Sequence, residues 1–111
     1  MKGTNIGEFE ELILLTIAGL SSKAYSVAIV DELDKLIRRK AKLGVVHAVL
    51  NRLEKKGFIA STLGESTSER GGKRKRFYQL TTSGKSALVT AKEQREKLWA
   101  VIPRVVFSEI K

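Results

Sequence analysis

The spacing of apolar residues predicts three helices in the first half of the chain. Asn5 can cap the first helix together with Glu8, and apolar residues follow at helical spacing. The second helix covers about residues 25–38, and the third covers about residues 44–56 before Gly57, which is expected to end it in the left-handed conformation. The expected inward-facing residues of the second and third helices are Ile29, Val30, Leu33, Leu36, Ile37, Val46, Val49, Leu50 and Leu53.

The period changes from helical to alternating after the third helix. Residues 58–63 and 73–80 are typical of two β-strands, and the polar stretch 64–72 between them contains glycines that favour a turn. Tyr78 and Leu80 fall on the same strand face and are expected to pack on the helices. The sequence therefore predicts a β-hairpin with a long tip.

A last helix is predicted over residues 84–102, with Thr82 as its cap and Pro103 as its stop. At 1.5 Å per residue it would be about 28 Å long and would extend beyond a three-helix core of this size. Its apolar residues therefore need a second copy of the chain to cover them, and Trp99 is expected near the centre of that interface. The residues of this stripe are Leu88, Ala91, Leu98, Trp99 and Ile102.

The order helix, helix, helix, hairpin, helix is that of a winged helix-turn-helix protein. The predicted fold is α+β and mainly α, with a winged-helix DNA-binding domain at 1–81 and a C-terminal dimerisation helix and tail at 82–111. Apolar residues make up 42% and charged residues 30% of the chain, which predicts an ordered protein, folded to about position 102. Without cysteine, a membrane-length apolar run or a signal peptide, it is expected to be cytoplasmic.

The net charge of +9 is concentrated in the middle of the chain. Residues 35–76 hold 13 Lys and Arg against only Glu54, Glu65 and Glu69, whereas the remaining residues are close to neutral. A localised positive field attracts a polyanion, so nucleic acid is the expected partner. The alternative is a solvated charged face with no partner.

The candidate DNA contacts lie on the third helix and the hairpin. Asn51 and Arg52 can read base edges, because Asn pairs with adenine and Arg with guanine, although either could instead bind phosphate or pair with Glu54 or Glu8. The other candidates, for the groove or the DNA backbone, are Lys42, His47, Lys55 and Lys56 around the third helix and Arg70, Lys73, Arg74, Lys75 and Arg76 in the hairpin. Alternation places Arg74 and Arg76 on the Tyr78 face and Lys73 and Lys75 on the other.

No arrangement of residues indicates catalysis, a metal or a cofactor. His47 is the only histidine, and a metal site there would need carboxylates alone to complete it. Glu8, Glu10 and Glu11 are expected to be cap and surface residues. The sequence therefore predicts a protein that is not an enzyme and needs no cofactor.

Residues 7–20, 24–33, 44–59 and 75–88 resemble the PadR family of bacterial repressors, winged-helix proteins that bind operators as dimers. The strongest element is GVVHAVLNRLEKKGFI, which is similar to the family's recognition helix. RKRFYQLTTSGKSAL follows at the right distance and is similar to the wing strand and the start of the last helix. The chain departs from the family where it has His47 and Ala48 in place of a Tyr-Pro pair, and Tyr25 and Ser26 in place of a Tyr-Gly pair.

The resemblance implies a homodimeric repressor of a two-fold symmetric operator. In some short family members a tryptophan on the last helix stacks on flat aromatic ligands, so Trp99 could bind an aromatic effector or could serve only as a packing residue. Two alternatives remain open for the function. One is a winged helix that binds nucleic acid without reading sequence, and the other is a winged helix whose hairpin binds an acidic protein.

Overall fold

The computed structural model describes residues 5–64 and 74–109 and confirms a mainly helical fold with one small sheet. The elements in chain order are α1 (Glu8–Leu20), the 3-10 helix η1 (Ser21–Lys23), α2 (Ser26–Ile37), α3 (Leu43–Lys55), β1 (Ile59–Leu63), β2 (Arg76–Leu80), α4 (Thr82–Ala100) and the 3-10 helix η3 (Arg104–Phe107). All four predicted helices and both strands are present, with ends that differ by at most three residues from those expected.

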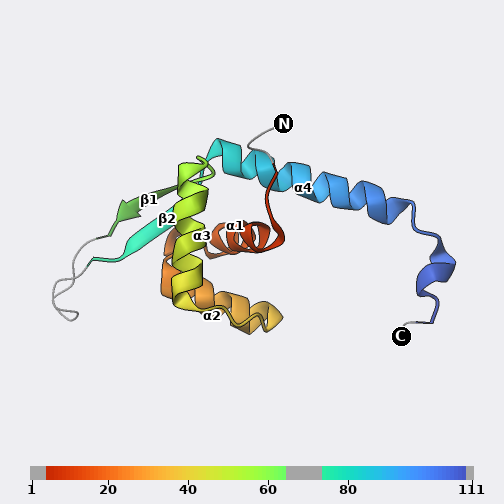
Figure 1. The fold of residues 1–111 in the computed structure, drawn as a ribbon, viewed down its shortest axis with the longest axis horizontal. Coiled ribbons are helices and arrows are strands. Elements are labelled where there is room, and N and C mark those ends of the chain that lie inside the picture. Colours follow the sequence, from red (N-terminus) through yellow and green to blue (C-terminus); the bar gives the residue numbers. More distant parts are fainter. Residues whose placement is uncertain (1–4, 65–73, 110–111) are drawn as a thin grey trace.

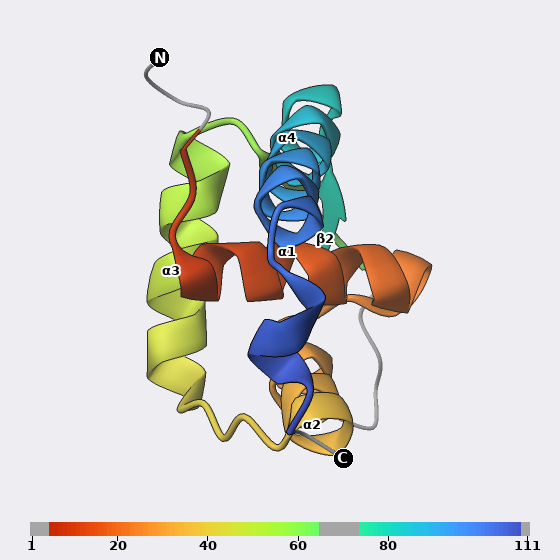
Figure 2. The ribbon, with the colours of Figure 1, turned by 90° about the vertical axis from the view of Figure 1, so that its right-hand side faces the viewer.

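The helix α1 lies at the centre of the molecule and contacts α2, α3, α4 and β2. In Figure 1, α3 stands upright beside it, the hairpin extends to the left and α4 leaves to the right. Figure 2, turned by 90°, shows α1 crossing the middle of the molecule with α2 below it. The fully buried side chains at the centre come from α1, α2 and α3, and include Ile13, Leu14, Ile17, Ile29, Val46, Leu50 and Leu53.

The inward stripe of α2 is shorter than the pattern predicts. Ile29 and Leu33 are buried, but Leu36 is 66% exposed and Ile37 is also exposed, so the expectation that both face the core is wrong. They line an apolar groove of about 180 Å³ between α1 and α2, together with Leu12. Within the described residues no third element closes this groove, which is why these side chains meet solvent.

The caps of two helices differ from those predicted. The N-cap of α1 is Gly7 and not Asn5, and the Glu10 carboxylate accepts a 2.8 Å hydrogen bond from the Gly7 N–H. The N-cap of α4 is Thr81 and not Thr82, because the Thr81 hydroxyl accepts a 3.1 Å hydrogen bond from the Gly84 N–H. Gly57, after α3, has a φ of +83°, which confirms the left-handed residue expected there.

The two strands are antiparallel, with Ile59 opposite Leu80 and Leu63 opposite Arg76. Tyr78 is buried as predicted, and its N–H donates a 2.8 Å hydrogen bond to the Ala24 carbonyl, which attaches the hairpin to the segment before α2. At the base of the hairpin, the start of α4 packs closely on the residue before β1, because Gly84 has no Cβ to overlap the Phe58 carbonyl. The hairpin, called the wing below, is therefore held against the helices at its base.

The second half of α4 extends away from the core (Figure 1). Leu98 is 70% exposed and Trp99 is 63% exposed. The folded chain continues past position 102, contrary to expectation, because η3 follows Pro103 and brings the Phe107 ring to 5.8 Å from the Trp99 ring in a stacked arrangement. An apolar surface thus runs from the end of α4 through η3.

No single helix in the described part of the chain is long and apolar enough to cross a membrane; α1 with η1 and α2 reach that length only as a pair bent by 118°.

Candidate nucleic-acid interface

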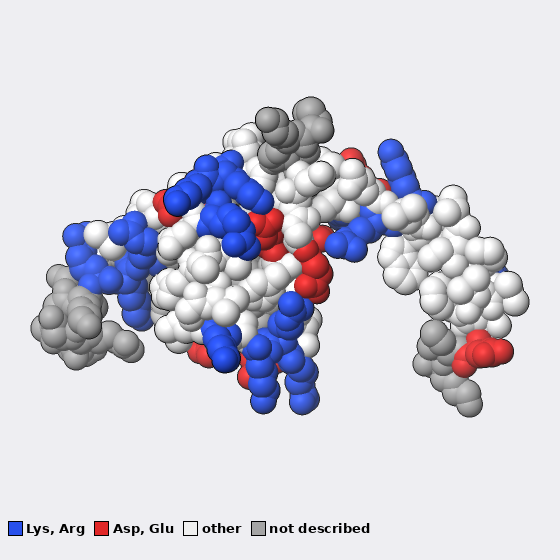
Figure 3. Space-filling view, viewed as in Figure 1, with Lys and Arg blue, Asp and Glu red and all other residues white. Residues whose placement is uncertain are grey.

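The outer face of α3 carries the exposed side chains that the sequence predicts for DNA contact. The helix buries Val46, Val49, Leu50 and Leu53 against its neighbours, which turns the opposite face to solvent. His47, Asn51, Arg52 and Lys55 are all exposed, as is Lys42 at the N-cap. Figure 3 shows Lys and Arg gathered over α3 and the wing, whereas the end of α4 and the residues after it are mainly uncharged.

The described part of the wing brings its cations next to the helices. The Lys75 ammonium lies 4.2 Å from the centre of the Tyr25 ring, and that ring packs edge-on against Phe77. The Arg74 Nε donates to the Gly64 carbonyl, and Arg76 donates to the Ser61 hydroxyl at 3.0 Å. The other two predicted wing contacts, Arg70 and Lys73, lie outside the described residues.

One hollow joins the wing to the helix-turn-helix. It has a volume of about 310 Å³ and is lined by residues from α2, α3 and β2 with the segment before it: Tyr25, Ser26, Val27, His47, Arg74, Lys75, Arg76 and Tyr78. His47 therefore lies beside the three wing cations although it is about 27 positions away in the sequence. Asn51 and Lys55 continue the same α3 face beyond this hollow.

Glu10 is buried, contrary to the sequence-based expectation. It was expected at the surface, but only 6% of it is exposed, and its carboxylate accepts hydrogen bonds from Arg52 Nε at 2.9 Å and from Lys56 Nζ at 2.9 and 3.1 Å. Burial raises the pKa of Glu10, but the hydrogen bonds from Gly7, Lys56 and Arg52 outweigh it and bring the pKa to about 2. The acidic partner of Arg52 is thus Glu10, and neither Glu54 nor Glu8.

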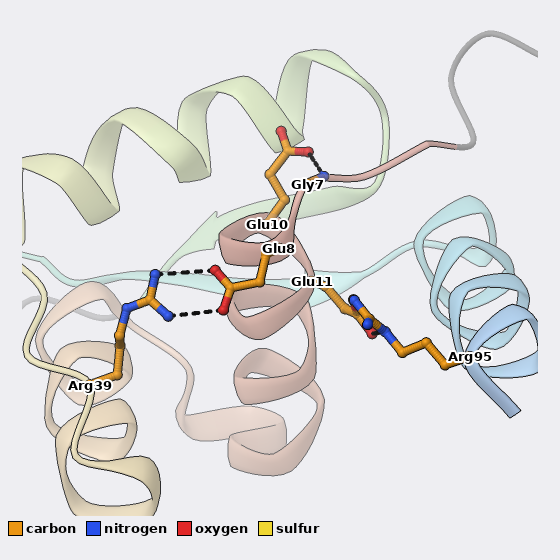
Figure 4. A network of polar contacts seen from close by, with 6 residues as sticks. All are labelled: Gly7, Glu8, Glu10, Glu11, Arg39 and Arg95. Atoms are coloured by element: carbon orange, nitrogen blue, oxygen red, sulfur yellow. Dashed lines mark hydrogen bonds and ion pairs between the residues drawn. The ribbon is translucent and has the colours of Figure 1, made fainter. Parts of the chain in front are cut away.

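Two further ion pairs start from the same turn of α1 (Figure 4). Arg39, in the connection between α2 and α3, donates to both oxygens of Glu8 at 3.0 and 3.2 Å, and this hydrogen bond lowers the pKa of Glu8. Arg95 of α4 donates to both oxygens of Glu11 at 2.6 and 3.3 Å. One acidic turn therefore connects α1 with the α2–α3 connection, with α3 and with α4.

Across residues 5–64 and 74–109, no group of three His, Asp or Glu side chains is placed to hold a metal ion. The chemistry available at this surface is hydrogen bonding and positive charge, which suits recognition of a polyanion.

The comparison with known families agrees with this geometry. The model of the transcriptional regulator PadR-like family matches residues 14–90, which is more than half of the chain and runs from α1 into α4. The chain belongs to the PadR-like family. As a member of a family of transcriptional regulators it is a DNA-binding protein and not an enzyme, which confirms the family and the class of function that the sequence indicates.

Several solved structures are similar to this PadR-like chain over most of its length. A PadR-like transcription factor from Bacteroides fragilis is 26% identical, with a TM-score of 0.64 over 85% of this chain and 89% of that chain. A PadR family regulator from Clostridium difficile is 25% identical, with a TM-score of 0.62 over 81% and 92%. A PadR family regulator from Eggerthella lenta, 22% identical with a TM-score of 0.67 over 92% and 88%, shows the same fold. No curated protein matches the chain.

Proposed function

We propose that this PadR-like protein is a cytoplasmic, sequence-specific repressor that acts as a homodimer on a two-fold symmetric operator. The observation that carries the proposal is the separation of two surfaces. The outer face of α3 and the wing are polar and basic, whereas the end of α4 is apolar and exposed. DNA fits the first surface, and a second copy of the chain fits the other.

In this proposal the α3 face enters the major groove and the wing lies along the neighbouring backbone. Asn51 reads a base edge, His47 contacts the groove wall, and Lys42 and Lys55 contact phosphates, because all four are exposed on or beside α3. Arg52 lies in the same footprint with its guanidinium held by Glu10. The wing cations, Arg70, Lys73, Arg74, Lys75 and Arg76, contact the backbone or the minor groove.

The dimer in this proposal forms through α4. Leu88 and Ala91 are partly covered by the chain itself, whereas Leu98 and Trp99 are largely exposed, so the distal part of the stripe needs a partner most. A two-fold axis through this region places two α3 helices in successive major grooves, about one helical turn apart. The expected operator therefore has inverted half-sites.

Selection of bound sequences from a random DNA pool tests the function directly. Asn51→Ala is expected to erase the preference at one base pair of each half-site, at a cost of about 1–3 kcal/mol per half-site for the preferred sequence, because Asn pairs with a single base through two hydrogen bonds. The matched control is Asn5→Ala, which removes the other asparagine, an exposed residue before α1 that lines a hollow with α4, and should leave the selected sequence unchanged.

The same experiment distinguishes the alternatives. An Asn51→Ala variant that weakens all sequences equally indicates a winged helix that binds DNA without reading bases. Absence of DNA binding by the unaltered protein at physiological salt indicates a wing that binds an acidic protein instead.

We further propose that a planar aromatic cation binds beside Trp99 and releases the DNA. The Trp99 indole is exposed and already has the Phe107 ring stacked on one side at an interplanar angle of 27°, so it offers a flat aromatic surface. Across a dimer interface, the partner's copy of this surface would complete a slot for a flat ligand.

A planar cationic dye that does not bind duplex DNA is expected to quench Trp99 fluorescence saturably and to lower DNA affinity by the linked amount. Trp99 is the only tryptophan, so the signal reports this site alone. Lack of quenching across a diverse set of such dyes would leave Trp99 as a packing residue. Quenching with unchanged DNA affinity would show that the slot binds ligands but does not regulate.

A further inference from the structure

Two cations at the C-terminal end of α3 direct their charged groups toward α1. Arg52 and Lys56 lie on the outer part of α3, and their side chains are 53% and 34% exposed. Their charged nitrogen atoms nevertheless contact the carboxylate of Glu10, whose side chain is only 8% exposed. Both side chains are partly exposed, while their charged groups are directed to α1.

The position of Glu10 explains why it holds both cations. It lies on the buried stripe of α1, three positions before Ile13, and its carboxylate is fixed by the hydrogen bond from the Gly7 N–H. A buried carboxylate is costly unless it is paired, so it binds its partners more strongly than an exposed one does. Within the described residues, Glu10 is the one buried charged residue, and it accepts hydrogen bonds from both Arg52 and Lys56.

We propose that Glu10 is a positioning residue for DNA binding, which holds Arg52 and Lys56 back from the phosphate backbone and so limits binding to unrelated sequences. This inference rests on the proposed function as a sequence-specific DNA-binding protein. It assigns Arg52 to the control of non-specific affinity, while Asn51 beside it reads the base edge.

Contacts to phosphates and contacts to base edges depend differently on the DNA sequence. Every cation that reaches a phosphate adds affinity for any DNA, because the counterions that it displaces are the same everywhere. A base contact adds affinity only for the preferred sequence. Holding two cations per subunit off the backbone therefore lowers affinity for every sequence, and unrelated DNA, to which no base contact adds affinity, is then bound only weakly.

The neighbouring acidic residue Glu11 provides a matched control. It lies on the same turn of α1 and also binds an arginine, but this is Arg95 of α4, which is away from the α3 face (Figure 4). Glu10→Gln and Glu11→Gln thus make the same change in charge; the first releases Arg52 and Lys56 at the C-terminal end of α3, and the second releases Arg95 on α4.

The experiment measures binding to a labelled 30-base-pair duplex of scrambled sequence and to the selected operator, from about 50 to 300 mM KCl. Glu10→Gln is expected to steepen the plot of log affinity against log salt for the scrambled duplex by up to about 3.5 in a dimer, because about 0.9 is added for each of four released cations. Affinity for the scrambled duplex should rise by about tenfold or more at the lowest salt, and affinity for the operator by a similar factor, because phosphate contacts do not depend on sequence. Glu11→Gln should change neither quantity. An unchanged slope in a folded Glu10→Gln protein would overturn the inference.

A second variant tests the inference without disturbing the buried carboxylate greatly. Arg52→Gln leaves Lys56 on Glu10 and should not alter the salt slope, because Arg52 does not neutralise a phosphate while Glu10 holds it. A slope flattened by about 1.8 in the dimer would show that Arg52 already contacts phosphate and would overturn the inference. If the unaltered protein selects no sequence, the proposed function is wrong; the slopes on scrambled DNA are measured independently of that result.

Discussion

A chain that ends after Lys85 is expected to be monomeric or insoluble and to lose operator binding. The truncation removes the exposed apolar surface of Leu98 and Trp99, which the proposed dimer covers. It also removes Ala87, which is buried, and Leu88, which packs against the core. A dimer that contacts both half-sites binds the operator about 10²–10⁴ times more tightly than one subunit binds a single half-site. A monomer loses this gain.

A shorter truncation, which removes only the residues after Glu96, separates dimerisation from folding. A chain that ends after Glu96 keeps Ala87 and the ion pair of Arg95 with Glu11, and should remain folded but monomeric. Sedimentation of the full-length and shortened chains measures the difference. A full-length protein that is still a monomer at about 50–100 µM would contradict the dimer, because that concentration reveals about 6 kcal/mol of association.

The helices and strands could be predicted because each buries one regular stripe against α1 or its neighbours. In α2 this pattern fails to predict burial. Leu36 and Ile37 lie on the apolar face of the helix, but nothing in the described chain covers them. Periodicity identifies the apolar face of a helix, whereas how much of that face is buried depends on where the neighbouring elements end. That extent is set by tertiary packing and is not encoded in local spacing.

Glu10 shows what sequence reading could have found. It stands at helical spacing with Ile13, Leu14 and Ile17, all of them buried, so its place on the inward stripe was a signal for a buried carboxylate. Its partners could not be named in advance, because Arg52 and Lys56 are 42 and 46 positions away in the sequence. The sequence instead suggested Glu54, two positions from Arg52, or Glu8, which stands on the same turn of α1 as Glu10 but binds Arg39.

The end of the chain was misjudged for a different reason. Pro103 does interrupt the helical pattern, and α4 ends at Ala100. A stop for one helix is not a stop for folded structure, because Phe107 returns in η3 to stack on Trp99. The aromatic and branched residues at 105–107 were the available signal, since an apolar cluster so close to an exposed tryptophan can pack against it.

Arg74→Ala combined with Arg76→Ala is expected to weaken binding to all DNA sequences alike. Both side chains are exposed, and among the described residues they donate to the Gly64 carbonyl and the Ser61 hydroxyl, so their removal leaves no buried charge there without a partner. If about four cations per subunit contact phosphates, the salt slope of the unaltered dimer is near −7, and the double variant should bring it to about −3.5. The fold should be unaffected, because an exposed cation contributes little to stability.

The matched control removes the same charge from α4, by Lys85→Ala combined with Lys92→Ala, which are exposed and lie outside the wing. That variant should keep the slope of the unaltered protein, because long-range attraction is screened within about 8–10 Å at physiological salt. A slope shallower than about −2 in the unaltered protein would contradict the role of the basic surface altogether. If the Arg74 and Arg76 variant lost affinity only for the selected operator, the wing would read bases, since backbone contacts carry no sequence information.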